Sequence, residues 1–500
     1  MATPQISPPS VWTSISDPWS SQQACGNDDP SPYSSPFIGL SDFDSMSDHA
    51  SSTSSSAHVI RVAIIGGGLG SACLLRGLLR YPHIAADLYD ARPRFRDEGP
   101  ALDLSEAHQE VLRALDPALD ACLDRAGAVY SSVALCVGTA TTSHGGIDVS
   151  GLPIPGRRTV GRQALLDEIL SDIPPYLLHT NTHIASVSGT SEADGGGGGA
   201  AFLEFVDGTR RRYDIVVGAD GTHSLARSFV VSGQGSGQTS TETGEEDPAH
   251  KPVSAGSWTL PLEVPLARAQ QAMSPVYLDP QSPCRAGWIG DGIFMQHDFL
   301  NHGRDVQISL SAILPPPVSA GGSAAAGPAW AKLFTPEEFE ATFAQNRSPA
   351  CQGMVKLVQS VYTIQIAGIV QMQHVPTRSY ARGRVCLLGG AAHAASPYHG
   401  ASGGLTLEQA MVLATLLGHS ASSGVGIRGF TKSGHSVEAS LPYYALKAYD
   451  AVCRPRADQV VQAASDVANT LLGRGGGGQS RDLDPRQYIG TFTAEMACGT

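Results

Sequence analysis

Residues 59–90 read VIRVAIIGGGLGSACLLRGLLRYPHIAADLYD, and this stretch decides the fold of the first part of the chain. Residues 59–65 are a short apolar run rich in β-branched side chains, which is typical of a buried parallel strand. A glycine turn follows at 66–70, and apolar residues recur at helical spacing over 69–79. A second strand is predicted at 86–89. This order predicts a βαβ unit of the kind that binds a dinucleotide.

The residues of the turn have separate roles in such a unit. Gly66 makes the tight turn, Gly68 lets the backbone approach a pyrophosphate, and Gly70 completes the turn. The N-terminus of the helix offers free N–H groups and the positive end of the helix dipole to that anion. Asp90 lies about 20 residues beyond the turn, where an acid accepts the ribose hydroxyls. Ser71 replaces the third glycine of the fingerprint, which mainly allows close helix–strand packing.

Composition limits the class of protein. The 500 residues exceed one ordinary core, so at least two subdomains are expected. A net charge of −13 argues against a nucleic-acid partner. Nine scattered cysteines without a CxxC pair indicate reduced thiols, and neither a disulfide framework nor a metal site. No apolar run reaches the ~18 residues that span a bilayer. We therefore expect a cytoplasmic protein.

Two later segments repeat the strand–turn–helix pattern. The strand 215–217 is followed by a turn at Gly218, Asp220 and Gly221, which alone is equally consistent with an ordinary connection. The strand 385–388 is followed by a glycine-bearing loop and an apolar helix, predicted at 405–417. The helix N-terminus at this loop stabilises negative charge beside it.

The order of these patterns predicts five segments. Residues 1–57 contain no Lys or Arg and are rich in Ser, Pro and Asp, so they are expected to be a disordered tail. A dinucleotide-binding domain is expected in two parts, 58–250 and 381–474, the second with a long closing helix. Between them, 251–380 is expected to form a substrate-binding domain with strands at 258–264, 289–296 and 305–313. Residues 475–500 are expected to be a flexible tail.

Four motifs in this order resemble the class A FAD-dependent monooxygenases, specifically the salicylate-hydroxylase-like aromatic-ring hydroxylases common among fungal enzymes. They are GGGLGS at 66–71, GADGTHSLAR at 218–227, GGAAHAASPYHGASGGLTLEQA at 389–410 and YDAVCRPRA at 449–457. The resemblance covers about residues 58–470. It implies an α/β fold: a Rossmann-like FAD-binding domain of the glutathione-reductase type with a parallel sheet, an inserted antiparallel-sheet substrate domain and a long C-terminal helix.

The resemblance also implies which residues contact FAD. Gly66, Gly68, Gly70 and Asp90 would hold its ADP half, and Arg162 and Asp220 its pyrophosphate and ribityl side. Backbone N–H groups of the segment 400–404 would face the flavin ring and favour its reduced, anionic form. The remaining cofactor-binding residues assigned in this way are Ala101, Asp103, Gly390, Gly400 and Gly403.

Three positions depart from the family pattern. Gly390 stands where the family has an Asp that holds the ribityl chain, and a charge-assisted hydrogen bond of this class is worth ~1.5–3 kcal/mol. Glu408–Gln409 replaces a Glu–Asp pair. Trp258 lies near the position at which some aromatic hydroxylases carry a Tyr, so no catalytic phenol is transferred.

The resemblance implies an NAD(P)H-dependent oxidoreductase. NADH or NADPH would reduce FAD, and O2 would add to give a flavin hydroperoxide that hydroxylates or epoxidises an aromatic or polyketide-derived molecule, in secondary metabolism. Arg227 could polarise a substrate phenolate, or form a salt bridge at a helix start. His297 could act as a base, or be a core or solvent-facing histidine. Tyr398, in the loop before the flavin-facing helix, is the third catalytic candidate.

Two alternatives from other classes remain open. The chain could be a flavoprotein oxidase or cyclase that inserts no oxygen. It could also be a non-catalytic relative that has lost FAD, which Ser71 and Gly390 would favour.

Overall fold

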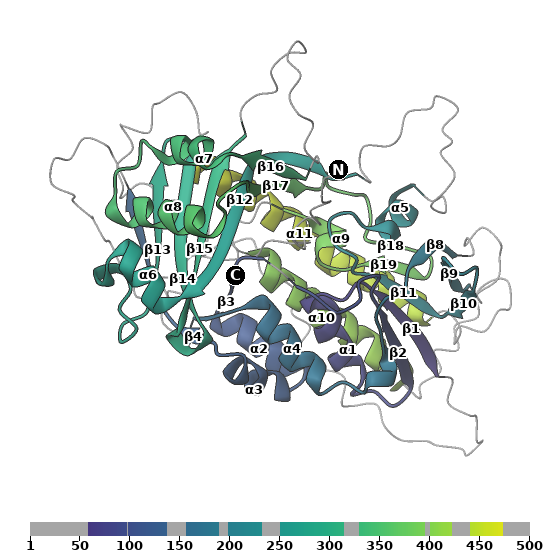
Figure 1. Cartoon of the computed structure of the whole chain (residues 1–500). Coiled ribbons are helices and arrows are strands. Elements are labelled where there is room, and N and C mark those ends of the chain that lie inside the picture. Colours follow the sequence, from purple (N-terminus) through teal and green to yellow (C-terminus); the bar gives the residue numbers. More distant parts are fainter. Residues whose placement is uncertain are drawn as a thin grey trace, which may run out of the picture.

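Two large sheets, one mainly parallel and one mainly antiparallel, carry the structure (Figure 1). The computed structural model describes residues 59–97, 99–137, 157–189, 199–232, 251–314, 330–395, 401–422 and 441–473. The two predicted tails, 1–57 and 475–500, lie outside these residues. Among the described residues, no helix combines the length and the apolar character that are needed to cross a membrane.

The first sheet has six strands in the order β18-β19-β11-β1-β2-β7. The strands are β1 (Ile60–Ile65), β2 (Ile84–Tyr89), β7 (Leu178–His179), β11 (Ile215–Gly218), β18 (Ala381–Arg382) and β19 (Val385–Leu387). β1 lies between β2 and β11 and pairs in parallel with both, and β11 pairs in parallel with β19. The predicted βαβ unit is therefore present. The late strand β19 returns to the same sheet as β1.

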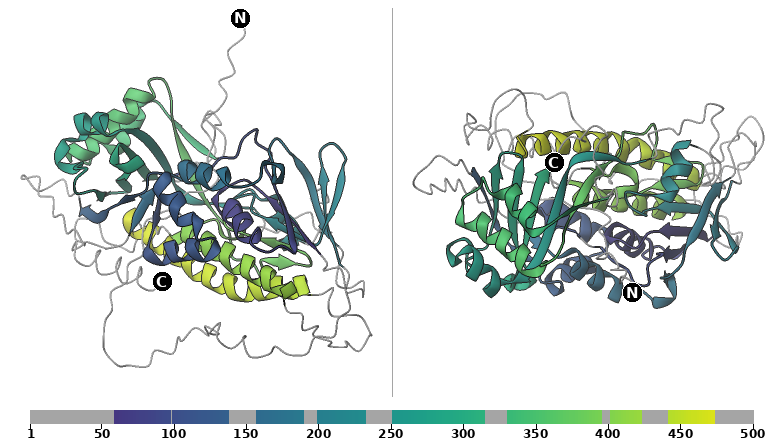
Figure 2. Two further views of the ribbon diagram at one scale, coloured as in Figure 1. Left: turned by 90° about the horizontal axis from the view of Figure 1, so that it is seen from below. Right: turned by 45° about the horizontal axis from the view of Figure 1, so that its top comes forward.

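Three helices pack on this sheet and on one another. They are α1 (Leu69–Leu78), α10 (Ala401–Ser422) and α11 (Leu441–Leu471). α10 contacts both α1 and α11, and α10 and α11 run side by side (Figure 2). The core strand residues Val62 and Ile64 are fully buried, as the β-branched pattern predicted. α10 begins four residues earlier than predicted, so Gly403 and Gly404 belong to its first turn.

The second sheet has seven strands in the order β16-β17-β12-β15-β14-β13-β5. The strands are β5 (Ser132–Val137), β12 (Val253–Pro265), β13 (Cys284–Gly290), β14 (Ile293–Leu300), β15 (Asp305–Ile313), β16 (Ala331–Phe334) and β17 (Ile366–Gln373). One face of this sheet packs against α6 (Leu266–Met273), α7 (Pro336–Phe343) and α8 (Pro349–Val361). β5 comes from the first part of the chain and pairs in parallel with β13.

The predicted single strand at 289–296 was wrong. The structure has a hairpin here, in which β13 and β14 pair antiparallel across a turn at Asp291 and Gly292. Gly292 has φ 71°, a left-handed conformation that glycine adopts without strain. The turn reverses the chain in the middle of the apolar run.

The remaining elements surround these sheets. Two small sheets have the orders β10-β9-β8 and β3-β6-β4. Their strands are β3 (Leu102–Leu104), β4 (Val129–Tyr130), β6 (Arg158–Val160), β8 (Ile184–Gly189), β9 (Ala201–Phe205) and β10 (Arg210–Tyr213). The strands β8, β9 and β10 lie beside the first sheet, and β6 contacts β14 of the second. The helices are α2 (Glu106–Leu115), α3 (Ala118–Arg125), α4 (Arg162–Ser171), α5 (Leu225–Ser232) and α9 (Gly390–His393). Ser105 caps α2 as predicted, since its side chain accepts a hydrogen bond from His108 N at 3.2 Å.

Candidate functional site

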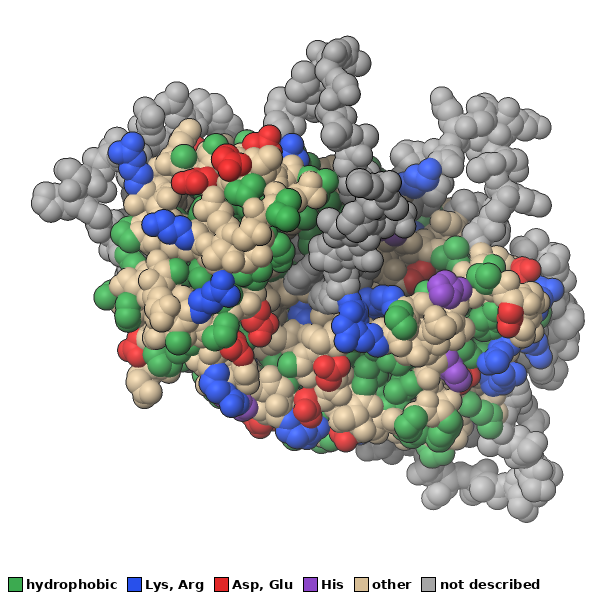
Figure 3. Space-filling view, in the orientation of Figure 1, with side chains coloured by type: hydrophobic (Ala, Val, Ile, Leu, Met, Phe, Trp, Pro, Cys, Tyr) green, Lys and Arg blue, Asp and Glu red, His purple; other side chains and the backbone are tan. Residues whose placement is uncertain are grey.

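A cavity of about 720 Å³ opens where four parallel strands end. Its wall includes the residues that follow the carboxyl ends of β1, β2, β11 and β19, which is where α/β sheets bind ligands. Its opposite wall comes from Trp330 and from β17 of the second sheet, at Ile369, Gln371 and Met372. The molecule is hollowed between the parts built on the two sheets (Figure 3). Eight predicted cofactor residues line the cavity: Gly66, Gly68, Gly70, Asp90, Arg162, Asp220, Gly390 and Gly403.

The glycine turn forms one side of the cavity as bare backbone. Gly66 has φ 101°, and a Cβ built there would lie 2.3 Å from the carbonyl oxygen of Ala219. A Cβ on Gly67 would lie 2.5 Å from a carboxylate oxygen of Asp90. No side chain fits at either position without a shift of the backbone or of Asp90. The turn therefore brings bare main chain to the cavity surface, where the N–H groups of Gly66, Gly67 and Leu69 donate to Tyr89 O, Asp90 and Asp97.

Asp90 closes the turn from the end of β2. Its Oδ2 accepts a hydrogen bond from Gly67 N at 2.7 Å, and both carboxylate oxygens also accept from Arg92. Arg92 and Asp90 form an ion pair at 2.7 Å. A ribose hydroxyl that binds Asp90 would compete with Arg92 for carboxylate lone pairs.

An acid that the sequence analysis did not single out lies at the N-terminus of α1. Asp97 Oδ2 accepts from Leu69 N at 2.7 Å, and Asp97 Oδ1 accepts from Arg162 Nε at 2.6 Å. Both side chains are almost completely buried and line the cavity. Among the described residues, Nη1 of Arg162 has no hydrogen-bond partner. The site therefore holds an anion at the helix N-terminus and still offers a buried cationic donor.

Asp220 and the third glycine motif form the far side of the cavity. Asp220 accepts from Leu225 N at 2.6 Å and from Ser224 Oγ at 2.5 Å, so its carboxylate binds the start of α5. Gln409 Oε1 accepts from Gly389 N at 2.9 Å and lies 3.0 Å from His393 Nε2. Burial lowers the pKa of His393 to about 4. His393 is thus a neutral, packed residue of the motif.

Arg227 is held away from the cavity surface. Its side chain is fully buried, and Nη1 donates to the carbonyl oxygens of Ala391 and Ala392 at 3.0 and 2.8 Å. Nη2 donates to the carbonyl oxygen of Val375 at 3.0 Å. Arg227 is therefore not placed to contact a substrate phenolate, contrary to the expectation from the sequence. Arg227 joins α5 to the segment of the third motif.

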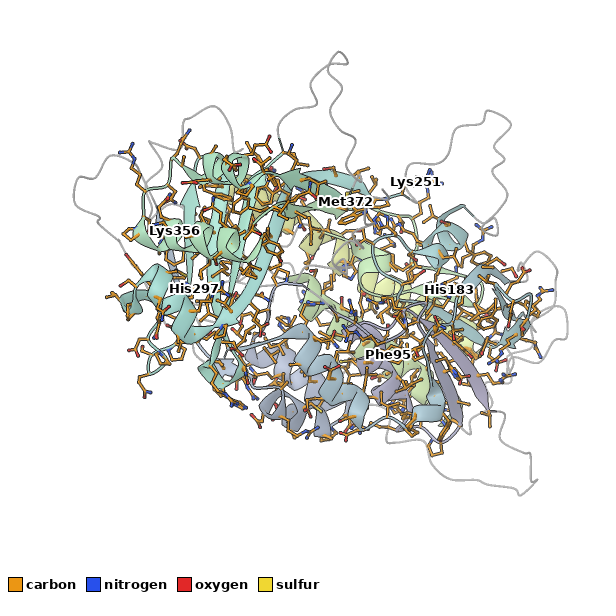
Figure 4. The ribbon with its side chains drawn as sticks, viewed as in Figure 1. Phe95, His183, Lys251, His297, Lys356 and Met372 are labelled. Carbon is orange, nitrogen blue, oxygen red and sulfur yellow. The ribbon has the colours of Figure 1, made fainter. Side chains whose placement is uncertain are left out.

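His297 also does not face the cavity. It pairs with Ile308 across β14 and β15, so its side chain shares the helix-covered face with Ile308. Its ring lies 5.4 Å from that of Trp288 and 6.0 Å from that of Phe299. Burial, with Arg285 nearby, lowers its pKa to about 4. Figure 4 labels it within the seven-stranded sheet. His297 is therefore a core histidine, and it is not placed to act as the expected base.

Two other predicted residues, Ala101 and Asp103, do not line the cavity, and two more are not among the described residues. Tyr398 and Gly400 lie outside the described residues. Ala101 N donates to Gln307 Oε1 at 2.6 Å, which ties its segment to the second sheet. Asp103 forms buried ion pairs with Arg157 and Arg285 at 2.5 and 2.7 Å. Asp103 therefore bridges the two halves of the structure.

The residues of this site fit a flavin dinucleotide. The glycine turn offers N–H groups, Arg162 offers an unpaired donor, and the cavity reaches from the strand ends to β17. The part of the chain that the structure describes contains no group of three metal-ligating side chains. Sequence reasoning missed Asp97 and the β17 wall, because neither belongs to a glycine motif.

Comparison with known proteins points to one class. No family model matches the sequence. The chain is 27% identical over 423 residues to the 6-methylsalicylate 1-monooxygenase atA of Aspergillus terreus, covering 82% of each protein. It is 26% identical over 442 residues to the FAD-dependent monooxygenase sor5 of Hypocrea jecorina, covering 84% of this chain and 87% of that protein. A solved salicylate hydroxylase in complex with substrate has a TM-score of 0.63 at 20% identity, covering 89% of this chain and 99% of that one.

Proposed function

We propose that this enzyme, a relative of the salicylate-hydroxylase-like FAD-dependent monooxygenases, uses NADH or NADPH and O2 to hydroxylate or epoxidise an aromatic or polyketide-derived molecule. The substrate belongs to secondary metabolism in this proposal. The observation that carries it is the cavity at the strand ends, where the glycine turn and Arg162 meet. The same cavity extends to β17, so cofactor and substrate sides adjoin.

The chain's own residues would bind the ADP half of FAD. N–H groups of the turn at 66–70 and the free Nη1 of Arg162 would contact the pyrophosphate, and Asp90 the ribose. Asp97 already accepts from Leu69 N and from Nε of Arg162, so the pyrophosphate would compete with it for Leu69 N. Nη1 of Arg162 is a separate donor, so the contact between Asp97 and Arg162 can remain when the pyrophosphate binds.

The other end of the cavity would hold the flavin ring. Gly390 and Gly403 line it, and Ile369 and Met372 form an apolar wall that excludes water from the reacting atoms. When bound, FAD supplies the redox chemistry that activates oxygen, and the protein positions the substrate beside it. The N-terminal end of the α10 dipole would stabilise negative charge next to that helix.

The first test is the visible absorption spectrum of the purified protein before and after addition of FAD. We expect a bound-flavin spectrum and consumption of NADH or NADPH that yields an oxygenated product. Flavin binding with a product that contains no new oxygen would favour the oxidase or cyclase alternative. A protein that binds no flavin even in excess FAD would be the non-catalytic relative.

Arg162→Ala tests the cofactor site directly. The variant removes the unpaired donor and leaves the Asp97 charge without its partner, so the affinity for FAD should fall by about tenfold or more. Arg113→Ala is the matched control, because Arg113 is half-buried, does not line the cavity, and pairs with Asp120 at 3.4 Å. FAD binding that is equal in both variants would contradict the assignment of Arg162.

A further inference from the structure

We propose that the substrate is a neutral, hydroxylated ring and not an aromatic carboxylate. The inference rests on the proposed function, because it takes the substrate to lie between the cofactor cavity and the seven-stranded sheet. It is carried by the charges and hydrogen-bonding groups on the sheet face that continues from the cavity.

We call this surface the inner face of the seven-stranded sheet. Strand residues alternate between two faces. Trp258, Leu310 and Met295 point to the helix-covered side, where they form the apolar core. Their neighbours in the strands point to the opposite side and are buried, and most of them are polar, with Ile289 and Phe294 as apolar exceptions. The inner face comprises Thr259, Arg285, Phe294, Gln296, Asp298, Gln307, Ser309 and Ser311.

The inner face is continuous with the cavity. Ile369 of β17 lines the cavity and pairs with Thr259 of β12. Thr259 pairs with Ser311 of β15, and their hydroxyls lie 2.8 Å apart. Ser311 pairs in turn with Phe294 of β14. A row of side chains therefore runs from the cavity wall across the sheet.

The charged groups at the end of the inner face balance one another. Asp103 accepts from Arg157 and Arg285, and Arg285 also donates to Asp298. All four side chains are almost completely buried. Two carboxylates and two guanidinium groups therefore form one neutral set. We call it the buried quartet.

A carboxylate substrate does not suit this arrangement. A carboxylate that leaves water needs a cation or several donors to offset its desolvation. Both arginines of the buried quartet already have carboxylate partners, so a substrate carboxylate that bound here would give the set a net negative charge.

Hydroxyl groups suit the inner face better. Ser309 is 4% exposed, and its Oγ has no hydrogen-bond partner among the described residues. Gln296 pairs with Ser309 across the strands and presents an amide on the same face. A ring hydroxyl can both donate and accept, so it can satisfy these neutral groups without a net charge.

The experiment compares two probes that differ at one group, salicylate and salicyl alcohol. Calorimetric titration of the FAD-loaded enzyme should give about tenfold tighter binding of the alcohol, because the acid places an unpaired charge on the inner face. Equal binding, tighter binding of salicylate, or no binding of either probe would overturn the inference.

Asp298→Asn supplies a gain-of-function test. This nearly isosteric change gives the buried quartet a net positive charge. Salicylate should therefore bind about tenfold more tightly, while the affinity for salicyl alcohol should change by less than about threefold. Asp291→Asn is the matched control, because it adds the same charge in the exposed turn of the same hairpin. Unchanged salicylate binding in a folded Asp298→Asn variant would overturn the inference.

Ser309→Ala tests the neutral side of the inner face. Loss of this hydroxyl should weaken the binding of salicyl alcohol by about three- to tenfold. Calorimetry detects binding of the probes whether or not the protein holds flavin. The proposed function and the proposed substrate class can therefore be contradicted separately. A protein without FAD overturns the proposed function, whereas a flavin-loaded enzyme that prefers the acid overturns only the substrate class.

Discussion

At Gly390 the backbone has room for the side chain that the family pattern would place there. A Cβ built on Gly390 would lie 3.4 Å from Cα of Gly221 and 3.6 Å from Thr222 N, which are ordinary contacts. Gly390 also lies on the cavity wall. The glycine at this position is thus not required by close packing, unlike Gly66, where a Cβ would overlap the backbone.

Gly390→Asp should therefore strengthen the binding of FAD. A carboxylate at this position adds a charge-assisted hydrogen bond, so we expect the dissociation constant to fall by about tenfold. Fluorescence titration of FAD measures the change. Gly390→Ala is the control, since it adds the Cβ without the carboxylate and should leave the affinity unchanged. An aspartate variant that binds FAD no better than the alanine variant would contradict the proposed position of the ribityl chain.

Single residues were predictable from the sequence where a motif fixes the backbone. Gly66, Gly68 and Asp90 line one cavity because their spacing follows from the strand–turn–helix geometry. Arg162 lines the same cavity, but only the family resemblance predicted it, since its local sequence would suggest a surface charge. Asp97 was not predictable in this way, since its contact with Leu69 N spans a loop. His297 and Arg227 show a different limit: which side of a strand or helix is buried depends on tertiary packing.

Between elements, α1 and α10 approach closely in the cofactor region. A Cβ on Gly70 would lie 2.3 Å from Cγ2 of Thr406, and both residues line the cavity. The contact continues about two turns further along α1, at Gly77, where a built Cβ would lie 3.0 Å from Cβ of Ala414. The small residues of α1 therefore set the distance between the two helices.

Gly70→Ala should destabilise the protein by about 1–3 kcal/mol, because the new methyl group overlaps Thr406. Urea unfolding at fixed pH measures this loss. Thr406→Ala removes the overlapping Cγ2, so the double variant should recover most of the stability that Gly70→Ala loses. If the two losses simply add, steric overlap between α1 and α10 is not the cause.

The elements themselves were mostly predictable, and the exceptions have physical reasons. β1, α1 and β2 followed from local periodicity and the glycine turn. The turn at Gly292 was missed although the sequence signals it: Asp291–Gly292 separates two apolar segments, and an Asp-Gly pair is typical of a two-residue hairpin turn. The pairing of β5 with β13 joins segments about 150 residues apart in the chain, and local pattern does not report such a contact.

For the molecule as a whole, four buried histidines make stability depend on pH. Burial lowers the pKa of His108, His297 and His393 to about 4 and that of His374 to about 3. Between the ordinary value of 6.5 and these values, the unfolded chain binds protons that the folded chain does not. The folded state is therefore most favoured above pH 6.5, and it loses stability as the pH falls toward 4.

We expect the melting temperature to fall between pH 6.5 and pH 4, with roughly 3 kcal/mol of stability lost for each fully buried histidine. His297→Phe keeps an aromatic ring in the core and should make the decline shallower. His183→Gln is the control, because His183 is exposed (Figure 4). Thermal melts at several pH values measure the slopes. A His297→Phe slope equal to that of the control would show that His297 is protonated in the folded state.

The contact of Asp97 with the start of α1 also bears on how the molecule is assembled. Asp97 gives Leu69 N and Nε of Arg162 an anionic partner within the chain, so these two donors are satisfied without an external anion, whereas Nη1 of Arg162 is not. The polypeptide can therefore complete this part of its fold before a nucleotide arrives. When a nucleotide binds later, its phosphate would replace the Asp97 carboxylate at Leu69 N. When the nucleotide leaves, the carboxylate would return to this donor, so the chain would stay folded.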